Sequence, residues 1–174
     1  MVKKFLIIDT SGRDSFVALH HPSGTLDSEI LPPLKQSQRL LPATQKLLQH
    51  EEIDFIAIGI GPGSFTGTRV GVMTAKTLSF ARKIPLLPFC SLLCHIPERE
   101  GPFTIMTDAK SQGVYTLKGT KTRNALFFEE PFLQKKDLEE PLPPLNLPFL
   151  ASYLLKQEKL FSHDEIQVSY LRSP

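Results

Sequence analysis

Residues 54–82, DFIAIGIGPGSFTGTRVGVMTAKTLSFAR, hold the pattern on which the predicted fold depends. We expect an apolar strand over residues 54–60, a glycine-rich turn over 61–66 and a helix over 67–82. Glycine permits close backbone approach, and the free N–H groups of a helix N-terminus bind anions. Neither G-x-x-x-x-G-K-[ST] nor G-x-G-x-x-G is present, however. The turn therefore predicts either an anion contact through Gly61, Gly63 and Ser64 or tight packing of the helix on a sheet.

The predicted helix over residues 67–82 has small residues at every fourth position: Gly67, Gly71, Ala75 and Ser79. Residues four apart share one face of a helix, so these form a narrow ridge on which a second helix can pack closely. Only three side chains of the helix are charged. Most of its surface therefore needs a cover, either from its own domain or from a partner. No apolar run reaches the roughly 20 residues of a membrane span, and no membrane association is expected.

A second candidate site follows the apolar run at residues 5–8, which is typical of a central strand buried on both faces. The run leads into Asp9, Thr10 and Ser11, residue types that suit a phosphate or Mg²⁺ contact. The alternative is an ordinary turn whose side chains hydrogen-bond to nearby backbone. Strands are expected next over 15–20 and 25–31, so the chain opens with an antiparallel meander.

A helix is expected to begin at Ser37. Its single apolar face is formed by Leu40, Leu41, Thr44, Leu47 and Leu48. After the strand and helix of residues 54–82, a short strand over 84–89 and a short helix over 91–95 complete a first lobe, residues 1–100. Its order is β-β-β-α-β-α-β-α, which predicts a mixed sheet, because strands that alternate with helices are usually parallel.

A second lobe, residues 101–174, repeats the opening of the first. An apolar strand over 103–108 ends in Asp108, and strands over 113–119 and 125–128 follow. Residues 131–148 predict an irregular connection, 149–159 a helix and 166–171 an extended tail. The fold class is therefore α/β: a two-lobed, actin-like or sugar-kinase-like arrangement in which the second lobe is reduced.

Composition excludes few functions. The 174 residues have a net charge of +2, with 41% hydrophobic and 22% charged residues, which is ordinary for a globular domain and too weakly basic to indicate nucleic-acid binding. Cys90 and Cys94 lie beside His95 without further ligands at zinc spacing, so we expect buried thiols and no metal site. No signal peptide precedes the first strand, and a cytoplasmic location is expected.

Six motifs together resemble the TsaB (YeaZ) family over nearly the whole chain. They are I-D-T-S at residues 8–11, Q-S-Q-R-L-L-P at 36–42, G-x-G-P-G-S-F-T-G-x-R-x-G at 59–71, T-A-K-x-L-x-F-A at 74–81, D-A-K-x-x-x-V-Y at 108–115 and Y-L-R at 170–172. The resemblance implies an actin-like (ASKHA, ribonuclease H-like) fold. It also implies a non-catalytic paralogue of TsaD, which binds and activates TsaD in the complex that makes N6-threonylcarbamoyladenosine (t6A) in tRNA.

The resemblance further implies which partners and ligands to expect. TsaD would form a heterodimer with this chain, the TsaE ATPase would join the pair, and tRNA would be bound through the complex. ATP or ADP and Mg²⁺ belong to the partner subunits, so no cofactor is expected here. TsaD binds its metal with two histidines four apart on its first helix, whereas this chain has Gln36, Arg39 and Leu40 there. Family members usually have a histidine where Gln36 stands. No catalytic residues are expected, despite the old glycoprotease label.

The predicted TsaD interface joins the two helices of the first lobe. It consists of Leu40, Leu41, Thr44, Leu48, Gly67, Arg69, Val70, Gly71, Thr74, Ala75 and Leu78. Gly71→Leu is expected to abolish TsaD binding while the chain stays folded. The same helices are expected to pair two copies of the isolated chain as a homodimer.

Two other functions remain open. One is a stand-alone actin-like ATPase or other nucleotide-binding enzyme, with Asp9 at Mg²⁺ and residues 61–67 near a phosphate; it requires a full second lobe. The other is a direct tRNA-binding module, which the weak net charge disfavours.

Overall fold

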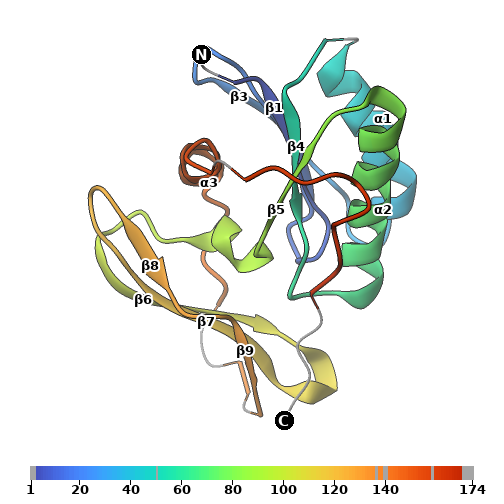
Figure 1. The fold of residues 1–174 in the computed structure, drawn as a ribbon. Helices are drawn as coiled ribbons and strands as arrows, with labels where there is room; N and C mark the ends of the chain where they lie inside the picture. Colours follow the sequence, from blue (N-terminus) through green and yellow to red (C-terminus); the bar gives the residue numbers. More distant parts are fainter. Residues whose placement is uncertain (1–2, 50, 136, 139–140, 158, 170–174) are drawn as a thin grey trace.

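A five-stranded sheet forms the centre of the computed structural model, which describes residues 3–49, 51–135, 137–138, 141–157 and 159–169 (Figure 1). Its strand order is β3-β2-β1-β4-β5. The strands are β1 (Phe5–Asp9), β2 (Phe16–His20), β3 (Leu26–Ile30), β4 (Phe55–Gly59) and β5 (Leu86–Phe89). β1 pairs antiparallel with β2 and parallel with β4, which in turn is parallel to β5. The predicted mixed sheet is confirmed.

Successive side chains of a strand point to opposite faces, and in β1 both faces are buried. Phe5 and Ile7 belong to one hydrophobic cluster, whereas Leu6 and Ile8 belong to another on the opposite face. The continuous apolar run of the first strand is therefore explained by cover on both sides of the sheet.

Two helices cover one face of this sheet: α1 (Gln36–Leu48) and α2 (Phe65–Arg82), at the right of Figure 1. α2 begins where Ser64 accepts a hydrogen bond from the Gly67 N–H through its hydroxyl oxygen, an ordinary N-cap. Leu40, Leu48, Val72 and Ala75 of the two helices pack with Leu6 and Ile8 of β1.

The other face is covered by the second lobe. β6 (Gly101–Asp108) pairs with β7 (Val114–Lys121), which pairs with β8 (Leu126–Phe128) and β9 (Phe132–Gln134), all antiparallel. Helix α3 (Leu147–Leu154) lies between the two sheets (Figure 1). Phe103, Ile105, Leu117 and Leu150 share one cluster with Phe5 of the first sheet.

Three predicted elements need correction. The helix at 91–95 is a 3-10 helix, η1 (Ser91–His95), not an α-helix, and η2 (Lys110–Gln112) is another. β9 lies in the stretch that was predicted as irregular. Its three residues, beside Pro131, are too few to show a strand periodicity, and they form a strand by pairing with β7. α3 begins earlier than predicted because Asn146 accepts the Phe149 N–H as its N-cap, and it also ends earlier, at Leu154.

The last described residues return to the first sheet. Leu86 and Phe161 exchange two backbone hydrogen bonds of 2.8 Å, and the Ser169 N–H donates to the Ile60 carbonyl at 2.9 Å. Ile166 is buried in the cluster beneath α2. The tail therefore contacts the first lobe, although its residues were assigned to the second; the division at residue 100 stays a prediction. Residues 170–174, which include the Y-L-R motif, lie outside the described residues.

Candidate functional site

The glycine turn and the turn after β1 meet at the carboxyl ends of β1 and β4. Asp9 is 4% exposed, and its Oδ1 accepts the Ser11 N–H at 2.7 Å and the Ser11 hydroxyl at 2.6 Å. The Cys94 thiol donates weakly to Asp9 Oδ2 at 3.6 Å. The structure thus brings together the six residues predicted as a nucleotide or phosphate contact: Asp9, Thr10, Ser11, Gly61, Gly63 and Ser64.

We call the contact between the glycine turn and the turn after β1 the joint. Its polar groups form hydrogen bonds with one another. The Ser64 N–H donates to the Ser11 carbonyl at 2.7 Å, and the Gly61 N–H donates to the Ser91 hydroxyl at 3.0 Å. The Thr10 hydroxyl donates to the Gly67 carbonyl at 2.6 Å. Several donors that an anion would need are therefore already used within the chain. This arrangement favours the packing interpretation of the turn, and a nucleotide contact stays a prediction.

Glycine is needed in the joint for close approach. A Cβ on Gly67 would overlap the Thr10 carbonyl oxygen, and a Cβ on Gly71 would lie 2.5 Å from the Thr10 hydroxyl oxygen. A Cβ atom essentially never lies this close to an atom that it is not bonded to, so a side chain at Gly67 forces the first turn and α2 apart, and one at Gly71 displaces the Thr10 hydroxyl. The small ridge of α2 is therefore the surface that packs on β1.

Burial also shifts the pKa values of Cys90, Cys94 and His95, which follow β5. It raises the pKa of the Cys94 thiol well above 9.0 and that of Cys90 to about 11, with Asp9 adding to both shifts. It lowers the pKa of His95, whose Nδ1 lies 2.6 Å from the Pro143 carbonyl. Both cysteines are thus protonated, inert thiols at neutral pH, as the sequence predicts. Within the described part of the chain, no three His, Cys, Asp or Glu side chains could hold a metal ion together.

The helix face predicted as the partner interface divides into two layers. Six of its residues are buried within the chain: Leu40, Thr44, Leu48, Gly67, Gly71 and Ala75. The prediction that the glycine ridge is itself the docking surface is therefore wrong, because the ridge is occupied by the chain's own sheet. Gly71→Leu would disturb the fold as well as any interface, so it does not isolate binding.

The remaining five predicted interface residues lie at or near the surface. Leu41 is 45% exposed and Arg69 is exposed, while Val70, Thr74 and Leu78 are half-buried. The prediction did not include Phe65, Met73 and Phe80, which are 57%, 61% and 69% exposed on α2. Their spacing of eight and seven residues is the signal that could have revealed them, because it places all three along one side of a helix.

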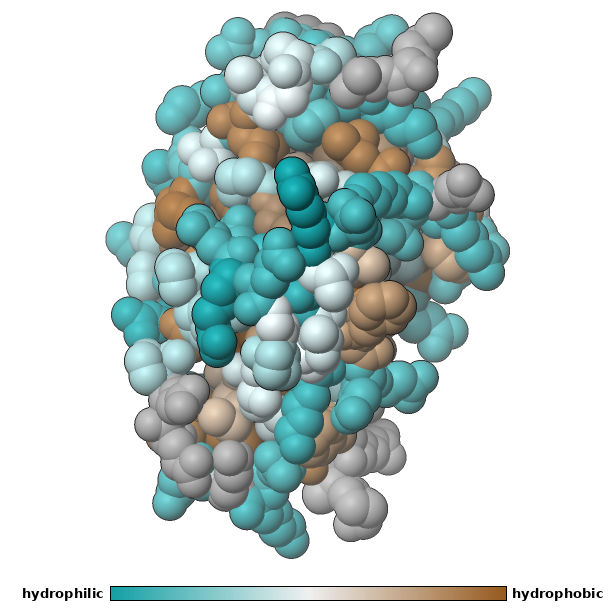
Figure 2. Space-filling model, turned by 90° about the vertical axis from the view of Figure 1, so that its left-hand side faces the viewer, coloured by the Kyte–Doolittle hydropathy of each residue, from teal (hydrophilic) through white to brown (hydrophobic). Residues whose placement is uncertain are grey.

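Arg69 is fixed on this outer surface by its neighbour. Its guanidinium carbon lies 3.7 Å from the centroid of the Phe65 ring, a cation–π contact within one helical turn. We use the name outer α2 face for the surface formed by Phe65, Arg69, Val70, Met73, Thr74, Leu78 and Phe80. By contrast, the side of the molecule at the left of Figure 1, away from α2, is mostly hydrophilic with small separate hydrophobic patches (Figure 2). The outer α2 face thus exposes three large apolar side chains, Phe65, Met73 and Phe80, beside Arg69.

Comparison with known proteins defines the class of this chain. Residues 34–126, more than half of it, match the family model described as "TsaD: tRNA N6-adenosine threonylcarbamoyltransferase". The tRNA threonylcarbamoyladenosine biosynthesis protein TsaB of Escherichia coli is 29% identical over 138 residues, which cover 73% of this chain and 59% of that protein. TsaB of Bacillus subtilis is 34% identical over 121 residues, 64% of this chain and 52% of that protein.

Solved structures agree with the fold. An uncharacterized protein from Pseudomonas aeruginosa, described as similar to peptidase YEAZ, superposes with a TM-score of 0.82 over 98% of this chain and all of its own, at 21% identity. YeaZ from Pseudomonas aeruginosa superposes with a TM-score of 0.65 at 25% identity, covering 80% of this chain and 72% of its own.

The chain therefore has the actin-like fold of the threonylcarbamoyltransferase-type proteins, and it belongs to their TsaB (YeaZ) family. It spans about half the length of the curated relatives it matches. Among the helices that the structure describes, none has both the length and the hydropathy for crossing a membrane.

Proposed function

We propose that this chain is a non-catalytic subunit of the complex that forms t6A in tRNA, and that it binds and activates TsaD. The TsaB relatives are named for the biosynthesis of this nucleoside. TsaE and tRNA join through the complex rather than through this chain alone. The observation that carries the proposal is the outer α2 face, where Phe65, Met73 and Phe80 are each more than half exposed.

The two layers of the helix pair have different roles in this proposal. The buried layer, which includes Gly67 and Gly71, fixes α2 on β1 and so sets the position of the outer side chains. The outer layer supplies the contact area: Leu41, Arg69, Val70, Thr74 and Leu78, together with Phe65 and Met73. Large apolar residues and arginine at the centre of an interface contribute most of the binding energy in protein complexes.

The packing of the glycine turn supports a non-catalytic role. A turn that binds phosphate needs free backbone N–H donors, whereas here the Ser64 and Gly61 N–H groups donate within the chain. Asp9, the residue that would lie at Mg²⁺, is 4% exposed and bonded to Ser11. Calorimetric titration of the isolated chain with ATP and Mg²⁺ tests this part: tight binding with hydrolysis in the absence of TsaD would favour the stand-alone ATPase.

The interface is tested with Met73→Glu, because Met73 is 61% exposed and its replacement leaves the core intact. A carboxylate buried in an apolar interface without a partner is expected to weaken TsaD binding about a hundredfold, equivalent to about 2.7 kcal/mol. Binding is measured by co-purification and by calorimetry with purified TsaD, followed by t6A formation in tRNA.

The matched control is Phe127→Ser on β8, which removes a side chain of 65% exposure from the second lobe. It is expected to bind TsaD as the unsubstituted chain does. If Met73→Glu binds TsaD with unchanged affinity, the outer α2 face is not the interface. If Phe127→Ser is the defective variant, the second lobe forms it instead.

A further inference from the structure

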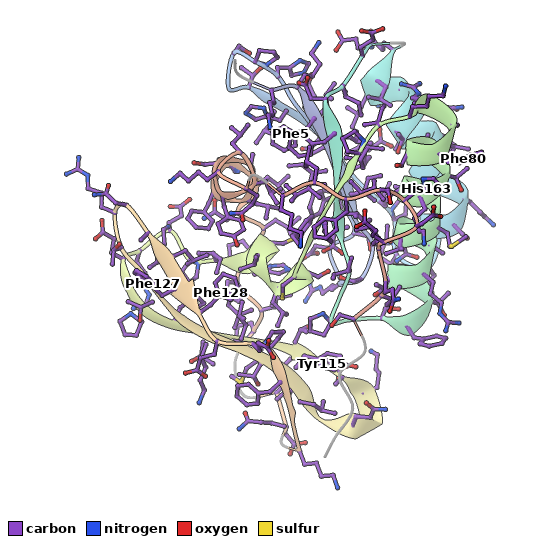
Figure 3. All side chains as sticks on the ribbon, in the orientation of Figure 1. Phe5, Phe80, Tyr115, Phe127, Phe128 and His163 are labelled. Carbon is purple, nitrogen blue, oxygen red and sulfur yellow. The ribbon has the colours of Figure 1, made fainter. Side chains whose placement is uncertain are left out.

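A hollow of about 780 Å³ opens between the C-terminal end of α2 and the tail segment 160–163. Its walls are mainly apolar and include Phe80, Ile84, Pro85, Leu160 and Phe161. Figure 3 shows Phe80 and His163 side by side at this corner, one from α2 and one from the tail. Pockets of 300–1,000 Å³ with apolar walls and few polar groups are typical small-molecule sites.

Hydrogen bonds hold both walls in place. On the helix side, the Lys83 N–H donates to the Ser79 carbonyl, and the Ser79 hydroxyl donates to the Ile84 carbonyl at 2.5 Å. On the tail side, Phe161 is fixed to Leu86 of β5 by two hydrogen bonds of 2.8 Å. Because its walls are already ordered, the hollow would lose little conformational entropy when a ligand enters.

Phe80 gives the hollow an exposed aromatic surface. Its side chain is 69% exposed, and its ring meets the His163 ring edge-on with centroids 5.2 Å apart. An aromatic or aliphatic group placed against Phe80, Ile84 and Pro85 would remove apolar surface from water on both partners, which favours binding.

Two lysines lie at the hollow. Lys83 lines it, and no carboxylate of the described residues forms an ion pair with Lys83. Lys159 lies beside the tail wall, with its ammonium nitrogen 4.9 Å from the centroid of the Phe161 ring. Two carboxylates also lie nearby, each bonded to its own neighbour: Asp164 Oδ1 lies 3.3 Å from His163 Nε2, and Glu165 accepts the Ser162 N–H at 2.7 Å. An anionic group would therefore find cations at the rim.

We propose that this hollow binds a small amphipathic anion, with its aromatic or aliphatic body against Phe80, Ile84 and Pro85 and its charged group beside Lys83. The site shares Phe80 with the outer α2 face but contains neither Phe65 nor Met73. Its test uses the isolated chain, so the inference does not depend on TsaD binding.

The probe for the test is 8-anilinonaphthalene-1-sulfonate, an aromatic anion whose fluorescence rises in apolar surroundings. We expect saturable binding to the folded chain, with shifts of the Phe80 and His163 ring signals in NMR spectra. Binding without shifts at these two rings would overturn the proposal, and so would the absence of saturable binding. This readout needs no variant, so it stands even if a substitution impairs folding.

Variants separate the apolar and the charged parts of the site. Ala81→Trp, which fills the hollow from α2, is expected to weaken probe binding about tenfold or more. Lys83→Met, which removes the charge and keeps the apolar stem, is expected to weaken it about threefold to fivefold. Lys35→Met, at an exposed lysine before α1, is the control and should bind normally. Unchanged binding by Ala81→Trp would overturn the site, and unchanged binding by Lys83→Met would overturn its preference for anions.

Discussion

The two lobes begin with the same local structure and put it in different surroundings. In the first lobe, the Ser11 N–H donates to Asp9 Oδ1 at 2.7 Å; in the second, the Lys110 N–H donates to Asp108 Oδ1 at 2.6 Å. Both are turns in which an aspartate at a strand end bonds to the backbone two residues on. Asp9 is 4% exposed, however, whereas the side chain of Asp108 is 51% exposed.

The elements that follow each turn explain this difference. Asp9 is covered by Gly59 of β4 and by Ser91 and Cys94 of η1. Within the described residues, neither element has a counterpart near the second turn. Asp108 is instead bonded by the N–H and ammonium groups of Lys110, which hold the pKa of its carboxyl below 3.8. A local sequence pattern thus fixes the turn, while the later strand, glycine turn and helix decide whether it becomes a buried joint.

The largest predicted effect is at the glycine that lets α2 approach the first turn. Gly67→Ala is expected to destabilise the chain by about 3 kcal/mol, because the added Cβ overlaps the Thr10 carbonyl oxygen. The measurement is urea unfolding followed by circular dichroism. Gly12→Ala is the control, since the atom nearest to its Cβ would be 3.9 Å away; a similar loss of stability in both variants would contradict the close-packed joint.

The two aspartates give a direct test of the comparison. Asp9→Ala is expected to cost about 2 kcal/mol, because it leaves the Ser11 N–H and hydroxyl buried without an acceptor. Asp108→Ala is expected to cost about 0.5 kcal/mol or less, since water can replace an exposed carboxylate. Equal losses of unfolding free energy in the two variants would show that burial of the first turn does not increase the stabilisation that its aspartate provides.

His95, under the first turn, makes the buried joint sensitive to acid. Burial lowers its pKa below 6.5, so between the two values the unfolded chain binds more protons than the folded one. The free energy of unfolding should therefore fall as the pH falls from about 6.5 toward the folded pKa, and stay constant in this respect above that window. His95→Gln should flatten this part of the pH profile.

The control for the pH profile is His163→Gln, at a surface histidine near the end of α2. If His95→Gln keeps the full slope, or if His163→Gln removes it, the acid sensitivity does not come from the joint.

The smallest predicted effect concerns a buried polar group that has no partner. Among the described residues, Thr44 Oγ1 is the one buried side-chain polar atom without a hydrogen bond. Thr44→Val keeps the shape and removes an unpaired hydroxyl, so it should leave stability unchanged or raise it by up to about 1 kcal/mol. Thr68→Val removes a hydroxyl that donates to the Ser64 carbonyl at 2.8 Å, and should destabilise. A clear loss in Thr44→Val would mean that its hydroxyl has a partner after all.

Much of the fold could be predicted because its signals are local. The apolar run of β1, the glycine turn and the apolar face of α1 each mark their element, and the order of elements gives the mixed sheet. β9 could not be predicted, since its three residues form a strand only by pairing with β7. The return of the tail was also missed, because a single bridge between Leu86 and Phe161 leaves no pattern in the sequence.

The candidate site was predicted in part. The sequence indicates that the residues around Asp9 and Gly61 come together, since the carboxyl ends of neighbouring parallel strands share one edge. It does not indicate whether their polar groups face a ligand or one another. The sequence also marks the helix over residues 67–82 as apolar on most sides. In the structure one of these sides is buried, as at Ala75, and another is exposed, as at Met73.

By itself, then, the sequence determined most of the elements, the mixed sheet and the shared family. Only the tertiary structure decided that Gly67 and Gly71 face β1, while Phe65 and Met73 face outward. The physical reason is that both sides of α2 carry apolar or small residues, so periodicity cannot choose between them. Steric fit decides the orientation. The backbone of the first turn can pack only where α2 has glycine, at Gly67 and Gly71, so the larger side chains face the surface.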